Sequence, residues 1–540
     1  MEKVIESLIQ KVNETHKNYD KAFISIGNPN IKAYVKIIKN TTNMKSQLMK
    51  QINNYKKKTG SFPKWLKVDV VIHEESTPFN EIERLLISTR RNYVDFGLVL
   101  DKQWQISFLP DEMNANAFVR PSKKNKKLKE IAENNITYFL KKHKRLNKKF
   151  KVEDYKNTYV TIFKTKGYFI EDEKIIDLYE QGDMKGIRQV NDLSSEIDKL
   201  IETSSKFLQN EIQPNGKYIY GYFPHFDREI NYYNILRHSS STYALTEGLA
   251  YLQKDISIIK KPLNYIIENY YYEKNDEAYI FDDTKSINEI KLGQNASFIF
   301  AVCEYLNFVP HDKQYLNHAQ KVAKGILSMI NMNNMETIHV LNYPDLSVKE
   351  HFRIVYYDGE AALALLRLYQ IDKNKLWLDT VEKLFERFIN ENYWKYHDHW
   401  LAYCSNELVK INPKEKYFEF GMKNAADYLD YIYQRETTFP TFLEMLMATY
   451  HLVNSAKNQG LEELIKGTID ENKLIETIHH RANFQRVGFF YPEIAMYFKN
   501  PKRILGSFFI KHHGYRVRID DIEHYLSGYV QYQKVFNQQI

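Results

Sequence analysis

The chain has 540 residues, of which 43% are hydrophobic and 27% are charged, and its formal net charge is +8. These values are typical of a folded, soluble protein with two or more domains. The longest unbroken apolar runs (298–303 and 361–366) have six residues, too few to cross a membrane. Nucleotide binding is not supported either, because the sequence has no glycine-rich phosphate loop.

The two cysteines, Cys303 and Cys404, are 101 positions apart and form no CxxC pattern. This argues against a disulfide scaffold or a zinc knuckle and favours a reducing compartment. The first twelve residues carry Glu2 and Glu6, where a signal peptide needs basic and then apolar residues. We therefore expect a cytoplasmic protein.

The first 170 residues mix strand and helix patterns. Period-two apolar runs predict strands, and amphipathic runs between them predict helices. They indicate an α+β domain over residues 1–170, whose role the sequence does not assign, and a linker over 171–194. The predicted strands are 21–28, 32–39, 65–74, 96–100, 104–109 and 157–164, and the predicted helices are 42–57 and 78–90.

Residues 123–151 hold twelve Lys/Arg and two acidic residues, a local charge of +10. Leu128, Ile131, Ile136, Phe139 and Leu140 are spaced as one helical face, which predicts a basic amphipathic helix. One interpretation is a solvated helix face. The other is a site for an anionic partner, such as a membrane surface or an acidic glycan. Nucleic acid is the less favoured partner, because no aromatic-interleaved binding motif accompanies the segment.

From residue 195 the pattern becomes helical, and the helices form six consecutive pairs. The first member of each pair is amphipathic, whereas the second is apolar over most of its surface, which places it inside. Six such hairpins predict an (α/α)6 toroid over residues 195–540. An open α-solenoid is the alternative, but the connecting loops are uneven and no fixed repeat length appears. The pairs are 196–211 with 234–253, 258–272 with 290–306, 313–332 with 358–370, 374–391 with 398–409, 417–433 with 440–455, and 471–485 with 519–534.

In a closed ring the inner helices begin at one mouth, so the polar residues that open them are candidates for one site. The first inner helix opens with Asn234, Arg237 and His238, at i, i+3 and i+4 on one face. The other five inner helices also open with polar residues. These are Gln294 and Asn295; Asp358 and Glu360; His397, Asp398, His399, Trp400 and Glu407; Arg435, Glu436 and Glu444; and Arg518, Asp520, Asp521 and His524.

Carboxylates are the strongest catalytic candidates, because cleavage of a glycosidic bond requires an acid and a second carboxylate. We predict that Asp358 or Glu360 acts with Asp520 or Asp521. Some of these residues have structural alternatives: Asp358 and Asp520 as helix caps, Arg237 as an anchor and His524 as a buried imidazole. The predicted substrate-binding residues are Asn234, Arg237, His238, Tyr233, Tyr357, Trp400 and His524.

Neither a metal nor a cofactor is predicted. His397 and His399 lie two positions apart, but the sequence offers no third ligand at a usable spacing.

The segments YYNILRHSSSTYALTEGL (232–249), YYDGEAALALLRLY (356–369) and VRIDDIEHYLSGY (517–529) resemble segments of bacterial proteins in the six-hairpin glycosidase superfamily. The resemblance covers residues 195–540 and rests mainly on architecture. It implies carbohydrate substrates and one of three reactions: hydrolysis, lyase chemistry on uronates, or sugar epimerisation. No catalytic motif aligns residue by residue, so no residue inherits a role.

Three functions follow from these observations. The first is a glycoside hydrolase that acts on a glycan or oligosaccharide, including an anionic one, with carboxyl oxygens roughly 5–9.5 Å apart. The second is an epimerase of the N-acylglucosamine type, with His238, His397 or His524 as proton shuttles. The third is a non-catalytic protein that binds a glycan or peptide. The sequence does not predict the oligomeric state.

Overall fold

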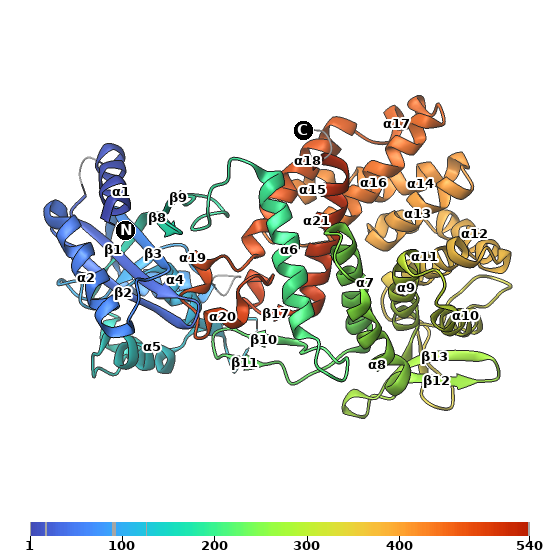
Figure 1. Ribbon diagram of the computed structural model, residues 1–540, viewed down its shortest axis with the longest axis horizontal. Coiled ribbons are helices and arrows are strands. Elements are labelled where there is room, and N and C mark those ends of the chain that lie inside the picture. The colour runs from blue at the N-terminus through green and yellow to red at the C-terminus, as the bar shows by residue number, and fades with distance from the viewer. Residues whose placement is uncertain (1, 17–18, 89–92, 126, 538–540) are drawn as a thin grey trace. The chain divides into compact units, whose positions relative to one another are not determined.

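The computed structural model describes residues 2–16, 19–88, 93–125 and 127–537. The chain forms two compact units (Figure 1). The first contains residues 1–191, 222–229 and 487–517, and the second contains residues 192–221, 230–486 and 518–540. This division differs from the predicted one, which assigned the whole of 195–540 to the toroid. Short strands lie where the chain passes between the units: β10 (Gly221–Phe223), β11 (Arg228–Glu229) and β17 (Val517–Arg518).

An antiparallel sheet in the order β2-β1-β3-β8-β4-β5, with β9 paired to β8, forms the framework of the first unit. Helices α1 (Glu2–Thr15) and α2 (Met44–Thr59) bury Leu8 and Leu48 in a core with Val68 of the sheet. The predicted α+β class is therefore confirmed. The strands are β1 (Lys21–Asn28), β2 (Ile31–Lys39), β3 (Trp65–Pro78), β4 (Gly97–Val99), β5 (Ser107–Phe108), β8 (Tyr159–Glu171) and β9 (Lys174–Asp177).

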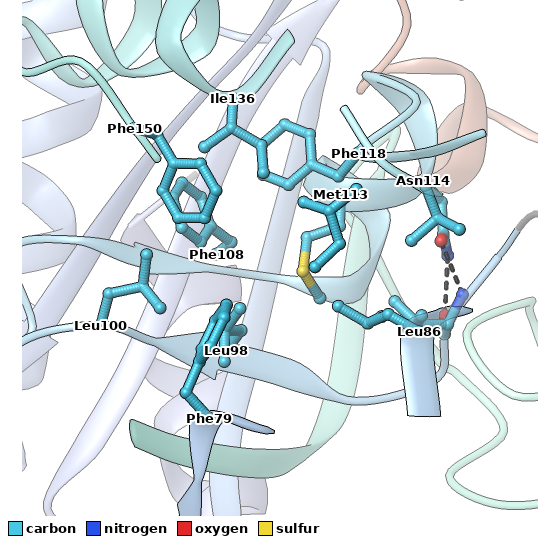
Figure 2. Close-up of a pocket in the computed structure, with 13 residues that line it drawn as sticks. Phe79, Leu86, Leu98, Leu100, Phe108, Met113, Asn114, Phe118, Ile136 and Phe150 are labelled. Atoms are coloured by element: carbon cyan, nitrogen blue, oxygen red, sulfur yellow. Dashed lines mark hydrogen bonds between the residues drawn. The ribbon is translucent and has the colours of Figure 1, made fainter. Parts of the chain in front are cut away.

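A second apolar core of this unit lies among α3 (Phe79–Ser88), α4 (Pro110–Ala115) and α5 (Glu133–Phe139). It encloses a cavity of about 20 Å³ (Figure 2). Asn114 is the one polar residue among the described residues of the lining. Its side-chain oxygen accepts a hydrogen bond from the Val94 amide, and its side-chain nitrogen donates one to the Val94 carbonyl. The cavity is therefore an apolar packing defect rather than a binding site.

The basic segment 123–151 does not form the predicted helix. Its first part belongs to a hairpin of β6 (Val119–Pro121) and β7 (Lys129–Ile131), and α5 follows only from Glu133. Ile136, Phe139 and Leu140 are buried as predicted, but Leu128 is 53% exposed on the hairpin. Asn125 and its neighbours favour a turn there, which the apolar spacing alone did not indicate.

Residues 487–517 fall within the predicted toroid range 195–540 but are part of the first unit. They contain the short helices α19 (Pro492–Ala495) and α20 (Pro501–Ile504). The Tyr497 hydroxyl lies 2.7 Å from Ser25 Oγ of β1, and Glu493 Oε2 lies 2.6 Å from Arg188 Nη2. Because this segment is rich in buried aromatic side chains, it packs into a core instead of remaining in solvent.

The second unit contains the six predicted helix pairs, with boundaries shifted by a few residues. Each inner helix packs against the next, and α21 packs against α7, which closes an (α/α)6 ring (Figure 1). The outer helix predicted at 417–433 is broken into α14 and α15. The outer helices are α6 (Leu193–Glu211), α8 (Lys260–Tyr270), α10 (Lys313–Ser328), α12 (Lys375–Asn390), α14 (Glu415–Ala426) with α15 (Leu429–Gln434), and α18 (Glu471–Phe484), which follows the short α17 (Glu462–Thr468). The inner helices are α7 (Ile235–Tyr251), α9 (Leu292–Phe308), α11 (Tyr356–Asp372), α13 (His399–Ile411), α16 (Thr441–Asn458) and α21 (Ile519–Phe536).

The inner helices are apolar on most sides because each contacts two neighbouring inner helices and an outer helix. In α11, for example, residues 357–366 are all buried. Among the described residues, no helix combines the length and the apolar character needed to cross a bilayer.

Candidate active site

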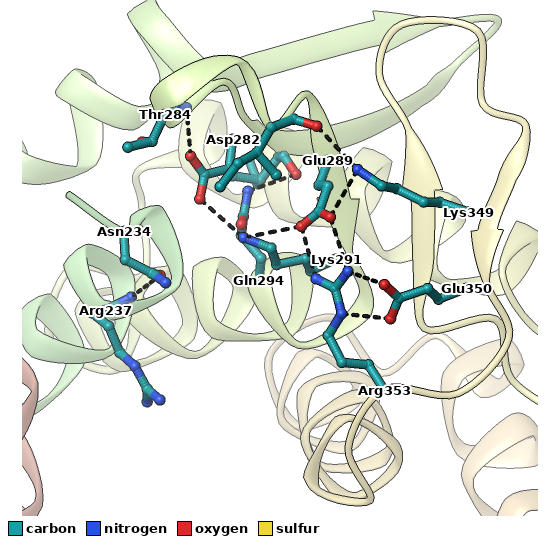
Figure 3. Close-up of polar contacts among 12 residues, drawn as sticks. Asn234, Arg237, Asp282, Thr284, Glu289, Lys291, Gln294, Lys349, Glu350 and Arg353 are labelled. Carbon is teal, nitrogen blue, oxygen red and sulfur yellow. Dashed lines mark hydrogen bonds and ion pairs between the residues drawn. The ribbon is translucent and has the colours of Figure 1, made fainter. Parts of the chain in front are cut away.

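Two long loops that precede inner helices form a five-stranded antiparallel sheet at the mouth of the ring. Glu289 forms ion pairs with Arg353 at 2.7 Å and with Lys349 at 2.9 Å. Lys291 forms an ion pair with buried Asp282 at 3.0 Å (Figure 3). These paired charges hold the loops in place. The strands are β12 (Tyr271–Lys274), β13 (Glu277–Asp282), β14 (Glu289–Lys291), β15 (Val340–Asn342) and β16 (Val348–Glu350).

Two histidines from non-adjacent inner helices face each other at the mouth. His399 is the first residue of α13, and His524 lies in the second turn of α21. Their rings are edge to face at an interplanar angle of 80°, with centroids 5.4 Å apart. The side chains expose 7% and 9% of their surfaces, respectively, so both imidazoles are largely shielded from solvent.

Carboxylates surround His524 and set its charge. Its Nδ1 donates a hydrogen bond of 2.8 Å to Glu444 Oε2 in the first turn of α16, and Glu523 Oε1 lies 3.5 Å away. Burial lowers the pKa of His524, but Glu523 and Glu444 outweigh burial and raise it to about 10. His524 is therefore an imidazolium at neutral pH, with its Nε2–H as a second donor.

His399 has the opposite character. Burial, together with the nearby positive charges of His524 and Arg237, lowers its pKa well below the ordinary value. Its Nε2 is buried and has no hydrogen-bond partner among the described residues, and Asp398 Oδ1 lies 3.6 Å from Nδ1. His399 is therefore a neutral imidazole, and a proton on Nδ1 would leave a lone pair on Nε2.

The position of His399 is fixed by the residue before it. Asp398 caps α13, since its Oδ1 accepts a bond from the Trp400 amide, and its backbone is clamped by the side chain of Asn424. Its Oδ2 lies so close to Gly359 of α11 that a Cβ there would be 2.2 Å away. Only glycine permits this approach of the two helices.

Trp400, predicted to bind substrate, lies beside the imidazole pair. Its ring stacks on Phe300 with centroids 5.0 Å apart, and its centroid is 6.4 Å from that of His524. The side chain is only 3% exposed, so it supports the pair from below the mouth more than it offers a stacking surface.

Asp520 and Asp521, predicted as catalytic carboxylates, are both in ion pairs. Asp520 Oδ1 lies 2.7 Å from Arg237 Nη1, and Asp520 Oδ2 lies 3.1 Å from Arg518 Nη2. Asp521 forms a two-pronged pair with Arg518 at 2.6 and 3.0 Å. These pairs join the first inner helix to the last and do not leave the two carboxylates available as an acid or a base.

Of the predicted carboxylates, Glu360 is the one whose surroundings suit acid–base chemistry. It is 4% exposed, and its Oε2 is buried without a hydrogen-bond partner among the described residues. Burial raises its pKa to about 8, against the opposing charge of Arg237. Gly293 of α9 provides the space, because a Cβ there would meet Oε2 at 1.8 Å.

Asp358 is the predicted alternative to Glu360 as the partner of Asp520 or Asp521. Its Oδ1 accepts a hydrogen bond from Thr337 and lies 3.5 Å from His339 Nε2, so it anchors the loop before α11. It is not the helix cap either, because α11 begins two residues earlier, at Tyr356. Tyr357, on the same turn, is 8% exposed and lies against His339.

The first inner helix contributes less to the mouth than predicted. His238 has no exposed surface; its Nδ1 bonds to the Tyr233 hydroxyl at 2.6 Å and its Nε2 to the Pro262 carbonyl at 2.9 Å. Burial lowers its pKa to about 3. His238 and Tyr233 therefore pack the ring wall, and their hydrogen bonds are to each other and to neighbouring backbone. Asn234 caps α7 through the Arg237 amide, and the Arg237 side chain is 35% exposed.

The structure brings three further residues to the site. His399 and Glu444 were among the polar residues predicted to open inner helices, without an assigned role, and Glu523 was not predicted. A helix-start position marks His399 and Glu444, but pairing them with His524 requires knowing which helices lie across the ring.

The chain matches no protein-family model and no curated protein sequence. Among solved structures it is similar to cellobiose 2-epimerase from Bacillus thermoamylovorans, at 12% identity and a TM-score of 0.50, over 64% of this chain and 100% of that one. A sugar epimerase from a ruminal bacterium gives 13% identity and the same score and coverage. A GH76 α-mannanase from Bacteroides thetaiotaomicron scores 0.44 at 12% identity, over 64% of this chain and 98% of that one. At these identities the likeness is one of fold: the chain shares the (α/α)6 ring with the two epimerases.

Proposed function

We propose that this protein is a carbohydrate-active enzyme that moves a proton at the carbon next to the carbonyl of an open-chain aldose. The reaction class is 2-epimerisation or the related aldose–ketose isomerisation. The observation that carries the proposal is the His399–His524 pair, with one neutral and one cationic imidazole whose ring centroids are 5.4 Å apart. Environments that drive two pKa values apart identify a base and an acid.

In the proposed reaction, His399 Nε2 takes the proton from C2, and the bonding electrons move to the carbonyl oxygen to give an enediolate. His524 Nε2–H then returns a proton to the opposite face of C2, which inverts that carbon as the carbonyl re-forms at C1. Delivery of a proton to C1 instead, with transfer of the O2 proton to O1, gives the ketose. Glu444 orients His524 and stabilises its positive charge. Arg237 supplies a cation for the enediolate oxygen.

The folds of the two epimerases add support, because in this chain an imidazole pair lies at the mouth of the same ring. The hydrolase prediction keeps one supporting observation, the raised pKa of Glu360, which suits a general acid. Its predicted partners Asp520 and Asp521 are held by Arg237 and Arg518, so a free second carboxylate is lacking among the predicted residues.

The test is incubation of the purified protein with glucose, mannose, cellobiose and N-acetylglucosamine in D₂O, followed by NMR. We expect deuterium at C2 together with appearance of the epimer or ketose. His399→Asn and His524→Asn each lower this rate by at least about 100-fold. His451→Gln, at a half-buried histidine on α16 outside the mouth, leaves the rate unchanged. Release of new reducing ends from oligosaccharides without C2 exchange would instead support the hydrolase, and binding without either reaction the non-catalytic alternative.

A further inference from the structure

The imidazole pair is part of a three-residue cluster drawn from three helices. One donor atom each of His399, Glu444 and His524 lies within 4.8 Å of the other two. None of the three residues exposes more than 9% of its surface. Three ligands on α13, α16 and α21 form a preformed, shielded site rather than a chance contact between surface residues.

Two donor atoms in the cluster have lone pairs available. His399 Nε2 and Glu444 Oε1 are both buried and have no hydrogen-bond partner among the described residues. Buried polar atoms are normally satisfied, so two unsatisfied acceptors within one three-residue cluster indicate a place for a further ligand. A positively charged or electron-poor ligand fits, because both atoms are acceptors.

The surrounding charge also favours a cation. Glu523 lies 3.5 Å from His524, and Asp520, Glu523 and His524 form a second cluster with donor atoms within 4.8 Å. These carboxylates concentrate negative charge beside the three ligands, which favours a bound cation.

We infer that His399, Glu444 and His524 form a binding site for a divalent transition-metal ion of the zinc class. Two imidazoles and one carboxylate match the three-protein-ligand sets of open zinc sites, which leave a coordination position for water. Imidazole ligands argue against Mg²⁺ and Ca²⁺, which prefer oxygen donors. Asp398, 3.6 Å from His399 Nδ1, is placed as the carboxylate that commonly supports a metal-bound histidine.

The metal site and the proposed reaction use the same atoms of His399 and His524. A metal ion on His399 Nε2 occupies the lone pair that the proposed reaction needs, and a metal ion on His524 removes the transferable proton. Metal binding and turnover are therefore mutually exclusive, so zinc is an inhibitor of the proposed enzyme rather than its cofactor. This last consequence rests on the proposed function, but the metal site itself does not.

The test is isothermal titration of Zn²⁺ into the chelator-treated full-length protein, with Co²⁺ absorption as a second readout. We expect one tight site with a stoichiometry of about one ion per chain. His399→Asn and Glu444→Gln each weaken this site by more than the roughly 10–100-fold typical of losing an outer-shell partner, and alter the Co²⁺ spectrum. His451→Gln is the matched control and changes neither.

Circular dichroism establishes that each variant is folded, and the two ligand variants report independently. Equal affinity in the wild type and both variants means an adventitious ion only, bound by surface histidines, and overturns the site. Because calorimetry needs no turnover, a protein that binds zinc here but exchanges no sugar proton retains the metal site and loses the proposed function. A protein that exchanges the sugar proton but binds no zinc at these residues retains the proposed function and loses only the metal site.

Discussion

Arg237 Nη1 lies 2.7 Å from Asp520 Oδ1, so an ion pair links the start of the first inner helix to the start of the last. Asp520 is also held by Arg518, and its side chain is 5% exposed. A ring of hairpins is closed by contact between its first and last members, and this pair lies at that closure.

We therefore expect Arg237→Gln to lower the free energy of unfolding by about 1–3 kcal/mol, because it leaves the buried Asp520 carboxylate with one partner fewer. Denaturant unfolding of Arg237→Gln, Asp520→Asn and the double variant measures the coupling. A coupling energy near zero would show that the pair contributes nothing to ring closure.

The Glu444–His524 hydrogen bond predicts a pH effect with a definite sign. The pKa of His524 is about 10 in the folded protein, above the unfolded value of 6.5. Its protonation therefore stabilises the fold fully below pH 6.5, and this stabilisation is lost as the pH rises toward 10.

Glu444→Gln removes one of the carboxylates that raise this pKa. We expect the alkaline limb of turnover to move to lower pH by about one unit or more, and the loss of stability with pH to begin earlier. The pH profile of C2 exchange and melting temperatures from pH 6 to 10 measure both. An unshifted alkaline limb would exclude His524 as the acid.

Glu360→Gln tests the buried carboxyl group. The folded pKa of about 8 lies above the unfolded value of 4.5, so ionisation of Glu360 increasingly destabilises the fold as the pH rises from 4.5 to 8. The glutamine variant cannot ionise. We expect it to be more stable than the wild type by roughly 2–4 kcal/mol at pH 8 and about equally stable at pH 4.

Denaturant midpoints at the two pH values measure this difference for Glu360→Gln. A variant destabilised equally at both pH values would mean that the Glu360 carboxyl is needed for packing and does not carry a buried charge. Turnover of the same variant separates the proposed functions, because the hydrolase requires a proton from Glu360 and the epimerase does not.

Gly359→Ala tests the approach of α11 to α13. The new Cβ would stand 2.2 Å from Asp398 Oδ2 and 3.1 Å from Leu401 Cγ, so the helix cap that positions His399 must shift. We expect a loss of about 1–3 kcal/mol in stability and a fall in kcat. Gly467→Ala on α17 is the control: no atom lies within 4 Å of its Cβ, so it should be neutral or slightly stabilising.

The helices of the ring could be predicted from sequence because inner and outer helices differ in their apolar surfaces. The predicted start at residue 398 differs by one residue from the observed start of α13 at His399. The site was harder to predict. His238 is a histidine near the start of an inner helix, as a mouth residue would be. In the structure, however, three tyrosine rings with centroids within 6.0 Å enclose it. Burial by other segments is not encoded in the helix's own pattern.

The error over residues 487–517 has the same cause. A long segment between two helices of a ring reads as a mouth loop, whereas its aromatic side chains belong to the core of the other unit. The five-stranded sheet at the mouth was missed because its strands have only three to six residues, too few to establish a period of two.

The division of the chain also imposes an order of assembly. Ser25 bonds to Tyr497, a partner 472 positions later in the chain. During synthesis from the N-terminus, the sheet of the first unit therefore lacks part of its packing until residues 487–517 have been made. The ring also waits, because α21 supplies its closing helix from residue 519. Neither unit can reach its final form on the ribosome much before the other, so we expect late, coupled folding and a nascent chain that depends on chaperones.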